Sequence, residues 1–86
     1  MEYITEKNRI YAIDGGREVA EITFPQTGEQ VYTINHTYVD DRWRGQGIAS
    51  ELVRRAVEEI ERRDGRVEAT CSYARLWLAR NRGCEY

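Results

Sequence analysis

Apolar and polar residues alternate along the first forty residues with the two-residue period of β-strands. The expected strands are residues 2–6, 9–14, 17–24 and 30–39. The last of these is the longest β-branched and aromatic run, and we expect it to be the central strand. Gly15 and Gly16 separate two of the runs and predict a two-residue hairpin. The turn-forming residues over 25–29 predict a loop before the central strand.

The period of the pattern becomes helical after residue 46. Apolar residues three and four positions apart predict a helix over about 47–62, with charged residues on its opposite face. The apolar face consists of Ile48, Leu52, Val53, Ala56, Val57 and Ile60. We expect this helix to end at Asp64 and Gly65, with Gly65 as a left-handed cap.

A second, shorter strand–helix unit follows the first helix. Residues 66–71 predict a strand, and Ser72 is the expected N-cap of a helix over about 73–81 that turns Leu76 and Trp77 toward the core. The predicted fold class is therefore α/β, with the order β-β-β-β-α-β-α. The strand–helix–strand connection makes the central strand and the last strand parallel neighbours.

Length and composition limit the classes of function. Eighty-six residues predict a single domain over residues 1–86, and we expect a monomer. The net charge of −2 offers no basic field for nucleic acid or an anionic membrane, and no apolar run approaches the roughly 20 residues that a membrane span requires. Two cysteines favour a reducing cytoplasm over a disulfide framework. His36 is the only histidine, so no metal site is expected.

The segment Arg44-Gly45-Gln46-Gly47-Ile48-Ala49 predicts an anion-binding site between the central strand and the first helix. Open N–H groups at a helix N-terminus attract phosphate, and the glycines allow a ligand to approach the main chain closely. Arg44 adds a guanidinium group that grips phosphate oxygens in two places. The spacing excludes two other phosphate loops. The P-loop lysine is absent, and Ser50 stands where the dinucleotide fingerprint has its third glycine.

Three segments resemble, in order and spacing, the small single-domain proteins of the GNAT acetyltransferase superfamily. They are the strand segment 36–40, the glycine loop 44–49 and the segment 71–73. In the loop, the family pattern Arg/Gln-x-x-Gly-x-Gly/Ala falls on Arg44, Gly47 and Ala49. The resemblance implies a minimal GNAT-like fold with acetyl-CoA bound where strands four and five splay apart. It also implies transfer of the acetyl group to an amine, either on a small molecule or on a protein lysine or N-terminus.

The resemblance also implies roles for individual residues in holding the cofactor. Arg44 and the main chain of the glycine loop would bind the pyrophosphate, and Ser50 would add a hydroxyl group. Tyr38 and Val39 would hydrogen-bond to pantetheine through their main-chain groups. The implied cofactor residues are Tyr38, Val39, Arg44, Gly45, Gln46, Gly47, Ile48, Ala49 and Ser50.

His36 and Cys71 are the implied catalytic residues, expected on adjacent parallel strands beside the cleft. In one scheme Cys71 accepts the acetyl group while His36 takes the proton. In the other, His36 acts as general base for direct attack by the amine, and Cys71 only lines the site. Leu78 stands where the superfamily often has a tyrosine that protonates the departing thiolate. This departure leaves a non-catalytic acyl-CoA-binding or interaction module as the alternative function.

Overall fold

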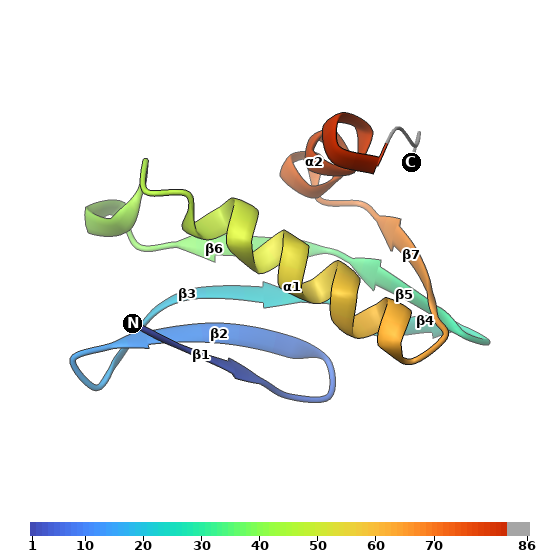
Figure 1. The fold of residues 1–86 in the computed structure, drawn as a ribbon, viewed down its shortest axis with the longest axis horizontal. Coiled ribbons are helices and arrows are strands. Elements are labelled where there is room, and N and C mark those ends of the chain that lie inside the picture. Colours follow the sequence, from blue (N-terminus) through green and yellow to red (C-terminus); the bar gives the residue numbers. More distant parts are fainter. Residues whose placement is uncertain (83–86) are drawn as a thin grey trace.

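Two small sheets and two helices make up the computed structural model, which describes residues 1–82 (Figure 1). The predicted α/β class is confirmed. The elements are β1 (Glu2–Thr5), β2 (Arg9–Asp14), β3 (Arg17–Thr23), β4 (Gln26–Gly28), β5 (Val31–Ile34), β6 (His36–Val39), the 3₁₀ helix η1 (Asp41–Trp43), α1 (Ile48–Arg62), β7 (Arg66–Ala69) and α2 (Ser72–Arg82). Neither α1 nor α2, as described, is long and apolar enough to cross a membrane.

The predicted central strand over 30–39 is divided at Asn35 into β5 and β6, which belong to different sheets. β5 pairs with β7 in parallel, as expected, whereas β6 pairs with β3 in the antiparallel order β1-β2-β3-β6. Thr23 secures the division, because its carbonyl oxygen accepts the N–H of Asn35 at 3.2 Å and its hydroxyl donates to Asn35 Oδ1 at 2.5 Å. β6 therefore turns away from β7, and the two strands diverge.

The turn residues have two different outcomes. Gly15 and Gly16 form the predicted hairpin, with φ angles of +60° and +76° that favour glycine. The predicted loop over 25–29 is wrong in part, because Gln26–Gly28 form the short strand β4 against β5. The turn composition did not predict this pairing, since β4 is an edge strand with a register irregularity.

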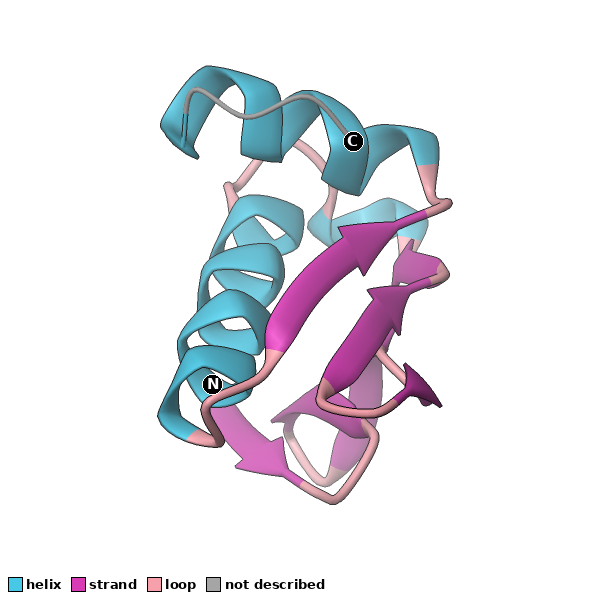
Figure 2. Ribbon diagram, turned by 90° about the vertical axis from the view of Figure 1, so that its right-hand side faces the viewer, coloured by secondary structure: helices cyan, strands magenta, loops and turns pink. Residues whose placement is uncertain are grey.

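The sheet β1-β2-β3-β6 has two faces of different chemistry. Its inner face carries Ile10, Ala12, Ala20 and Ile22, which are fully buried together with the apolar face of α1. The residues between them point the other way, because side chains alternate along a strand. From the register, this outer face consists of Glu2, Ile4, Arg9, Tyr11, Ile13, Glu18, Glu21, Thr23, His36 and Tyr38. Figure 2 shows both helices on one side of the strands.

The C-terminus of α1 corrects one expectation about Gly65. The left-handed residue is Asp64, at φ +57°, while Gly65 N–H donates to the Ile60 carbonyl at 2.8 Å in a Schellman arrangement. Glycine is needed at position 65 because there is no space for a side chain. A Cβ there would lie 2.8 Å from the ring of Tyr32 and 2.9 Å from Ile60 Cγ2.

α2 begins one residue earlier than expected and presents a different face to the core. The Cys71 carbonyl accepts the first helical hydrogen bond, from Arg75 N–H at 3.0 Å, so Cys71 rather than Ser72 is the N-cap. Ala74 and Leu78 are buried, whereas Leu76 is 48% exposed, so its predicted core position is wrong. Apolar residues lie on more than one side of this helix, and periodicity did not select the buried side.

Candidate functional site

The loop between β6 and α1 ends in a glycine that begins the helix in a left-handed conformation. Gly47 is the N-cap of α1 at φ +79°, and no side chain caps the helix there. Glu51 N–H donates to the Gly47 carbonyl at 3.0 Å, so the N–H groups of the turn before it have no helical partner. A Cβ at Gly47 would meet no atom within 4 Å. Glycine is therefore required for its φ angle, and the N–H groups face open space.

Asp40 and Trp43 hold this loop against the sheet. The Asp40 carboxylate accepts the Arg42 N–H at 2.9 Å, and its carbonyl accepts the Trp43 N–H at 2.8 Å. The hydrogen bond from Arg42 lowers the pKa of Asp40, outweighing the opposing effect of burial, and the charges of Arg42 and Arg17 add to the lowering. Trp43, which stands between two arginines in the loop, is half-buried against the core. The loop is therefore anchored at its start.

A cavity of about 390 Å³ opens directly beside the N-terminus of α1. Its lining residues are Thr37, Val39, Trp43, Arg44, Gly45, Gly47, Ile48, Ala49, Ser50 and Tyr73. The structure thus brings together all the predicted cofactor residues except Tyr38 and Gln46. Arg44 is well exposed at the mouth, with its Nε 3.1 Å from Asp41 Oδ1. Thr37 and Tyr73 were not predicted here, because the tertiary fold alone brings them beside the loop.

The free edge of β6 presents different residues from those expected. Asp40 N–H donates to the Val19 carbonyl at 2.8 Å, so by the alternation of an antiparallel ladder the main chain of Tyr38 faces β3. The main-chain groups of Thr37 and Val39 face away from β3, toward the diverging β7. The expected main-chain role for Tyr38 is therefore not supported, and Thr37 takes its place beside Val39.

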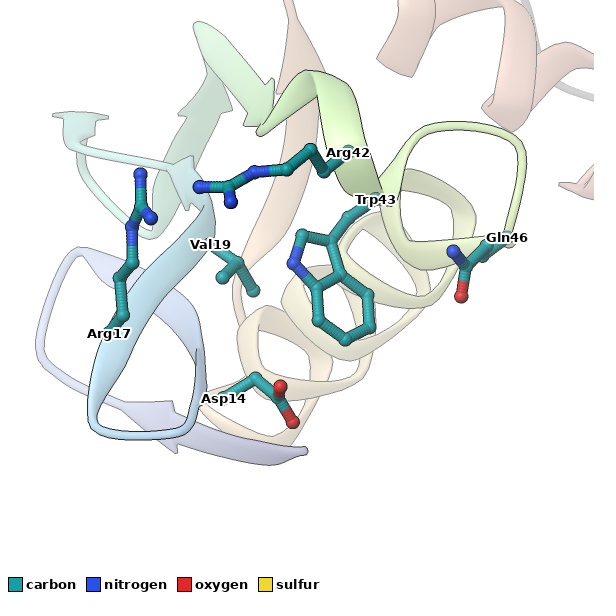
Figure 3. Close-up of a pocket in the computed structure, with 6 residues that line it drawn as sticks. All are labelled: Asp14, Arg17, Val19, Arg42, Trp43 and Gln46. Carbon is teal, nitrogen blue, oxygen red and sulfur yellow. The ribbon is translucent and has the colours of Figure 1, made fainter.

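Gln46 lies in a second cavity, of about 350 Å³, on the other side of Trp43 (Figure 3). Arg17 and Arg42 also line this cavity, and Figure 3 shows the Arg42 side chain extending past the indole ring of Trp43 toward Arg17. Each guanidinium group lies 3.7 Å from an oxygen of Asp40, which offsets part of their charge. The Gln46 side chain thus faces away from the α1 N-terminal cavity, whereas its predicted contact with pyrophosphate is through the main-chain N–H group and stays a prediction.

Cys71 and His36 do not face each other, which corrects the expectation that they flank the same cleft. The Cys71 thiol lies 3.6 Å from Thr37 Oγ1, on the inner side of β6. His36 is the neighbour of Thr37 and points to the outer face, where its Nε2 lies 3.9 Å from Glu21 Oε1. The physical reason is the division at Asn35, since β6 pairs with β3 instead of continuing beside β7.

Ser50 connects the two helices at the edge of the cavity. Its Oγ accepts the indole N–H of Trp77 at 2.8 Å, which places α2 against the first turn of α1. The Ser50 hydroxyl hydrogen remains available to a ligand, because a hydroxyl donates and accepts at once. Residues 1–82 contain no group of three or more His, Cys, Asp or Glu side chains that could hold a metal ion.

The divergence of β6 from β7, with an open helix N-terminus beside it, defines a small α/β domain built around a glycine loop. The chain belongs to the GCN5-related N-acetyl-transferase family, whose model matches residues 9–86. A GCN5-like protein from Staphylococcus aureus, solved by NMR, superposes with a TM-score of 0.75 at 29% identity, covering 95% of this chain and 81% of its own.

Two further relatives extend the comparison. Protein NATD1 from Bos taurus is 29% identical over 69 residues, which is 80% of this chain and 61% of the relative. The chain thus spans about three fifths of the length of that protein. A Bacillus anthracis acetyltransferase in complex with acetyl coenzyme A has the same fold, with a TM-score of 0.62 and 18% identity over 78% of this chain and 40% of its own.

Proposed function

We propose that this protein binds acetyl-CoA and transfers its acetyl group to an amine. The observation that carries the proposal is the left-handed Gly47 N-cap, which lacks a side-chain cap and opens into the cavity beside the free edge of β6. A diphosphate fits the open N–H groups of a helix N-terminus, and Arg44 at the mouth adds positive charge. Family membership supports the same ligand, as does the acetyl coenzyme A in the Bacillus anthracis relative.

The free edge of β6 gives pantetheine a path from this loop. Val39 lies nearest the loop and Thr37 follows, and the main-chain groups of both face away from β3. The Val39 carbonyl accepts a hydrogen bond from Arg44 Nε at 3.4 Å, so the Val39 N–H and the main-chain groups of Thr37 form the open part of this edge. Pantetheine carries two amide groups, which match such an edge as a strand would. Cys71 lies further along this edge of β6, and its thiol contacts the Thr37 hydroxyl. The thioester is therefore expected near Cys71 and Asn35, where the strands part.

Direct transfer fits this arrangement better than a covalent acetyl-cysteine. In direct transfer the amine nitrogen attacks the thioester carbonyl carbon, the C–S bond breaks, and CoA leaves as a thiolate. The amine gives up a proton, for which His36 is the candidate base on the outer face, with Glu21 beside it. The covalent scheme needs His36 to take the proton of Cys71. These two side chains lie on opposite sides of β6, which disfavours that scheme.

A non-catalytic acyl-CoA-binding module remains the second candidate, because of Leu78. This residue stands where the superfamily often has a tyrosine acid, and its side chain is 1% exposed in the core. A leucine side chain cannot protonate a thiolate. In this second candidate function, the protein binds the cofactor at the same site but does not transfer the acetyl group.

The test is a titration with CoA and acetyl-CoA followed by amide NMR, and then an assay of acetyl transfer to a panel of amines. The proposal expects shifts at residues 37, 39 and 44–50, and acetylated product. Shifts without product on any amine would favour the binding module. If neither ligand shifts these amides, the cofactor assignment is wrong.

A further inference from the structure

We propose that the acceptor is a lysine side chain in a basic polypeptide segment, and that this segment docks on the outer face of the sheet β1-β2-β3-β6. The inference rests on the proposed function, because it names the class of amine and the surface that receives it. Three observations carry it: the route open to an acceptor, the charge of the outer face and its shape.

The first observation is that the inner side is filled where the strands part. Ile34 and Ala74 are fully buried and Leu78 is 1% exposed, so the core occupies the space beneath the divergence of β6 and β7. α1 packs on β2, β3 and β6, and α2 packs on α1 and β7. In residues 1–82 both helices lie on the inner side (Figure 2). An amine therefore reaches the thioester from the outer face, where Asn35 and His36 are exposed.

The second observation is an excess of carboxylates on that face. Arg9 alone pairs with three of them: Glu18 at 2.7 Å, Glu21 at 2.8 Å and Glu6 at 3.2 Å. The hydrogen bond to Glu18 raises the pKa of Arg9 above its ordinary value, against the opposing effect of burial. Glu2 adds a further carboxylate on β1. The field of the outer face is therefore negative and favours a cationic partner.

The aromatic residues of this face suit the same partner. Tyr11 and Tyr38 lie on either side of Glu21 in one cross-strand row, since Glu21 pairs with both. The guanidinium carbon of Arg9 already lies 4.1 Å from the Tyr11 ring centroid, a cation–π contact within the protein itself. None of the cation–π contacts within residues 1–82 involves the ring of Tyr38, and Tyr38 is 46% exposed. A ligand cation has an aromatic face available there, next to the Glu21 carboxylate that Arg9 and His36 already contact.

The third observation is that the outer face is open at Glu21, His36 and Tyr38, while a cavity of about 480 Å³ adjoins it beside Asn35. Arg9 and Thr23 also line this cavity, and neither it nor the two cavities on either side of Trp43 is lined by Glu21, His36 or Tyr38. Small-molecule sites are usually concave, so that most of the ligand surface is buried. An open acidic surface instead suits a lysine whose polypeptide supplies the remaining contacts. A polypeptide can contact this open surface and the adjoining cavity together, which favours a basic segment over a free polyamine.

The first experiment measures binding without turnover. Two heptapeptides, each with one central lysine flanked by two arginines or by two glutamates, are titrated into the full chain saturated with CoA, and amide shifts are recorded. The arginine peptide is expected to shift residues 18, 21, 36 and 38, and the glutamate peptide to leave them unchanged. Shifts confined to other surfaces, or equal shifts by both peptides, overturn the inference.

Charge variants then test the cause of the preference. Glu18→Gln should lower the preference for the arginine peptide about threefold, because one exposed charge has a modest effect. Arg9→Gln should raise it by a similar factor, because it leaves the carboxylates uncompensated. The matched control is Glu58→Gln, since Glu58 is 48% exposed, pairs with Arg54 and lies on α1. Thermal unfolding of each variant confirms that it is folded. The inference fails if Glu18→Gln and Glu58→Gln have equal effects.

The acetyl-transfer assay separates this inference from the proposed function. Transfer to the arginine peptide, with little to spermidine or the glutamate peptide, supports both. Transfer to spermidine in preference to the arginine peptide keeps the proposed function and overturns the polypeptide acceptor. If CoA shifts residues 44–50 and the arginine peptide shifts the outer face without product, the docking surface stands and acetyl transfer fails.

Discussion

The thiol of Cys71 lies 3.6 Å from the hydroxyl of Thr37, across the gap that opens where β6 leaves β7. The first side chain belongs to the N-cap of α2 and the second to the inner face of β6. This contact places the thiol at the free strand edge that we assign to pantetheine. It also satisfies the thiol with a hydroxyl group, while the imidazole of His36 stays on the other face.

The first prediction concerns Cys71 itself. Cys71→Ala should retain acetyl transfer to within about threefold, because direct transfer needs no covalent acetyl-cysteine. Initial rates and intact mass after incubation with acetyl-CoA measure the two effects together. Thr37→Val, which removes the hydroxyl partner at similar volume, is the matched control. An acetylated Cys71 that turns over, together with loss of activity in Cys71→Ala, would establish the covalent scheme.

The second prediction concerns His36 as the base. His36→Gln should lower kcat by about 100-fold or more, the range in which a positioned general base contributes. The Kd for CoA should stay unchanged, because His36 lies on the outer face. A kcat reduced less than threefold would show that another group or water takes the proton.

The third prediction concerns the loop that begins α1. Gly47→Glu should raise the Kd for CoA by more than about tenfold, because a carboxylate at the N-cap competes with the diphosphate for the same N–H groups. Gly16→Glu is the matched control, since Gly16 also has a positive φ, of +76°, and open surroundings. Calorimetric titration measures both. Equal affinity in the two variants would contradict the pyrophosphate site.

The fourth prediction separates the roles of two neighbouring turn residues after α1. Gly65→Ala should lower the free energy of unfolding by about 1–3 kcal/mol, because its Cβ would lie within 3 Å of Tyr32 and Ile60. Asp64→Gly should instead raise it by a few tenths to about 1 kcal/mol, since Asp64 has φ +57°. Urea unfolding measures both. The opposite signs distinguish a need for space from a need for a left-handed residue.

The fifth prediction concerns stability in acid. The hydrogen bond from Arg54 lowers the pKa of Glu51, with Arg55 assisting and burial opposing. Because the unfolded chain binds this proton more readily, Glu51 stabilises the fold at pH values above its ordinary pKa, near 4.5. That contribution is lost as the pH falls through the lowered value. Between about pH 3 and 6, the free energy of unfolding should therefore depend less steeply on pH in Glu51→Gln than in the unaltered protein. Urea unfolding at several pH values measures this slope. An unchanged slope would contradict the assignment.

Local patterns in the sequence predicted most of the elements and the glycine loop that begins α1, and the binding of an anion by this loop stays a prediction. The helical spacing from Ile48 to Ile60 predicted the buried face of α1, and the two glycines of the hairpin predicted their own turn. The positions of Gly45 and Gly47 before a helix predicted a loop that leaves the N–H groups of the helix N-terminus open. These features depend on contacts within a few residues, such as turn dihedral angles and the first turn of a helix. The amino-acid sequence by itself therefore determines these local features.

The tertiary structure decided which side chains meet. Asn35, a residue type depleted in strands, interrupts the β-branched and aromatic run over 30–39, but nothing local indicates that the two halves join different sheets. The division comes from Thr23, twelve residues away, and from pairing with two different strands. A strand's faces and free edge depend on its partner, because its side chains and hydrogen bonds alternate. The same pairing therefore determined that Cys71 meets Thr37 and that His36 faces the acidic outer surface.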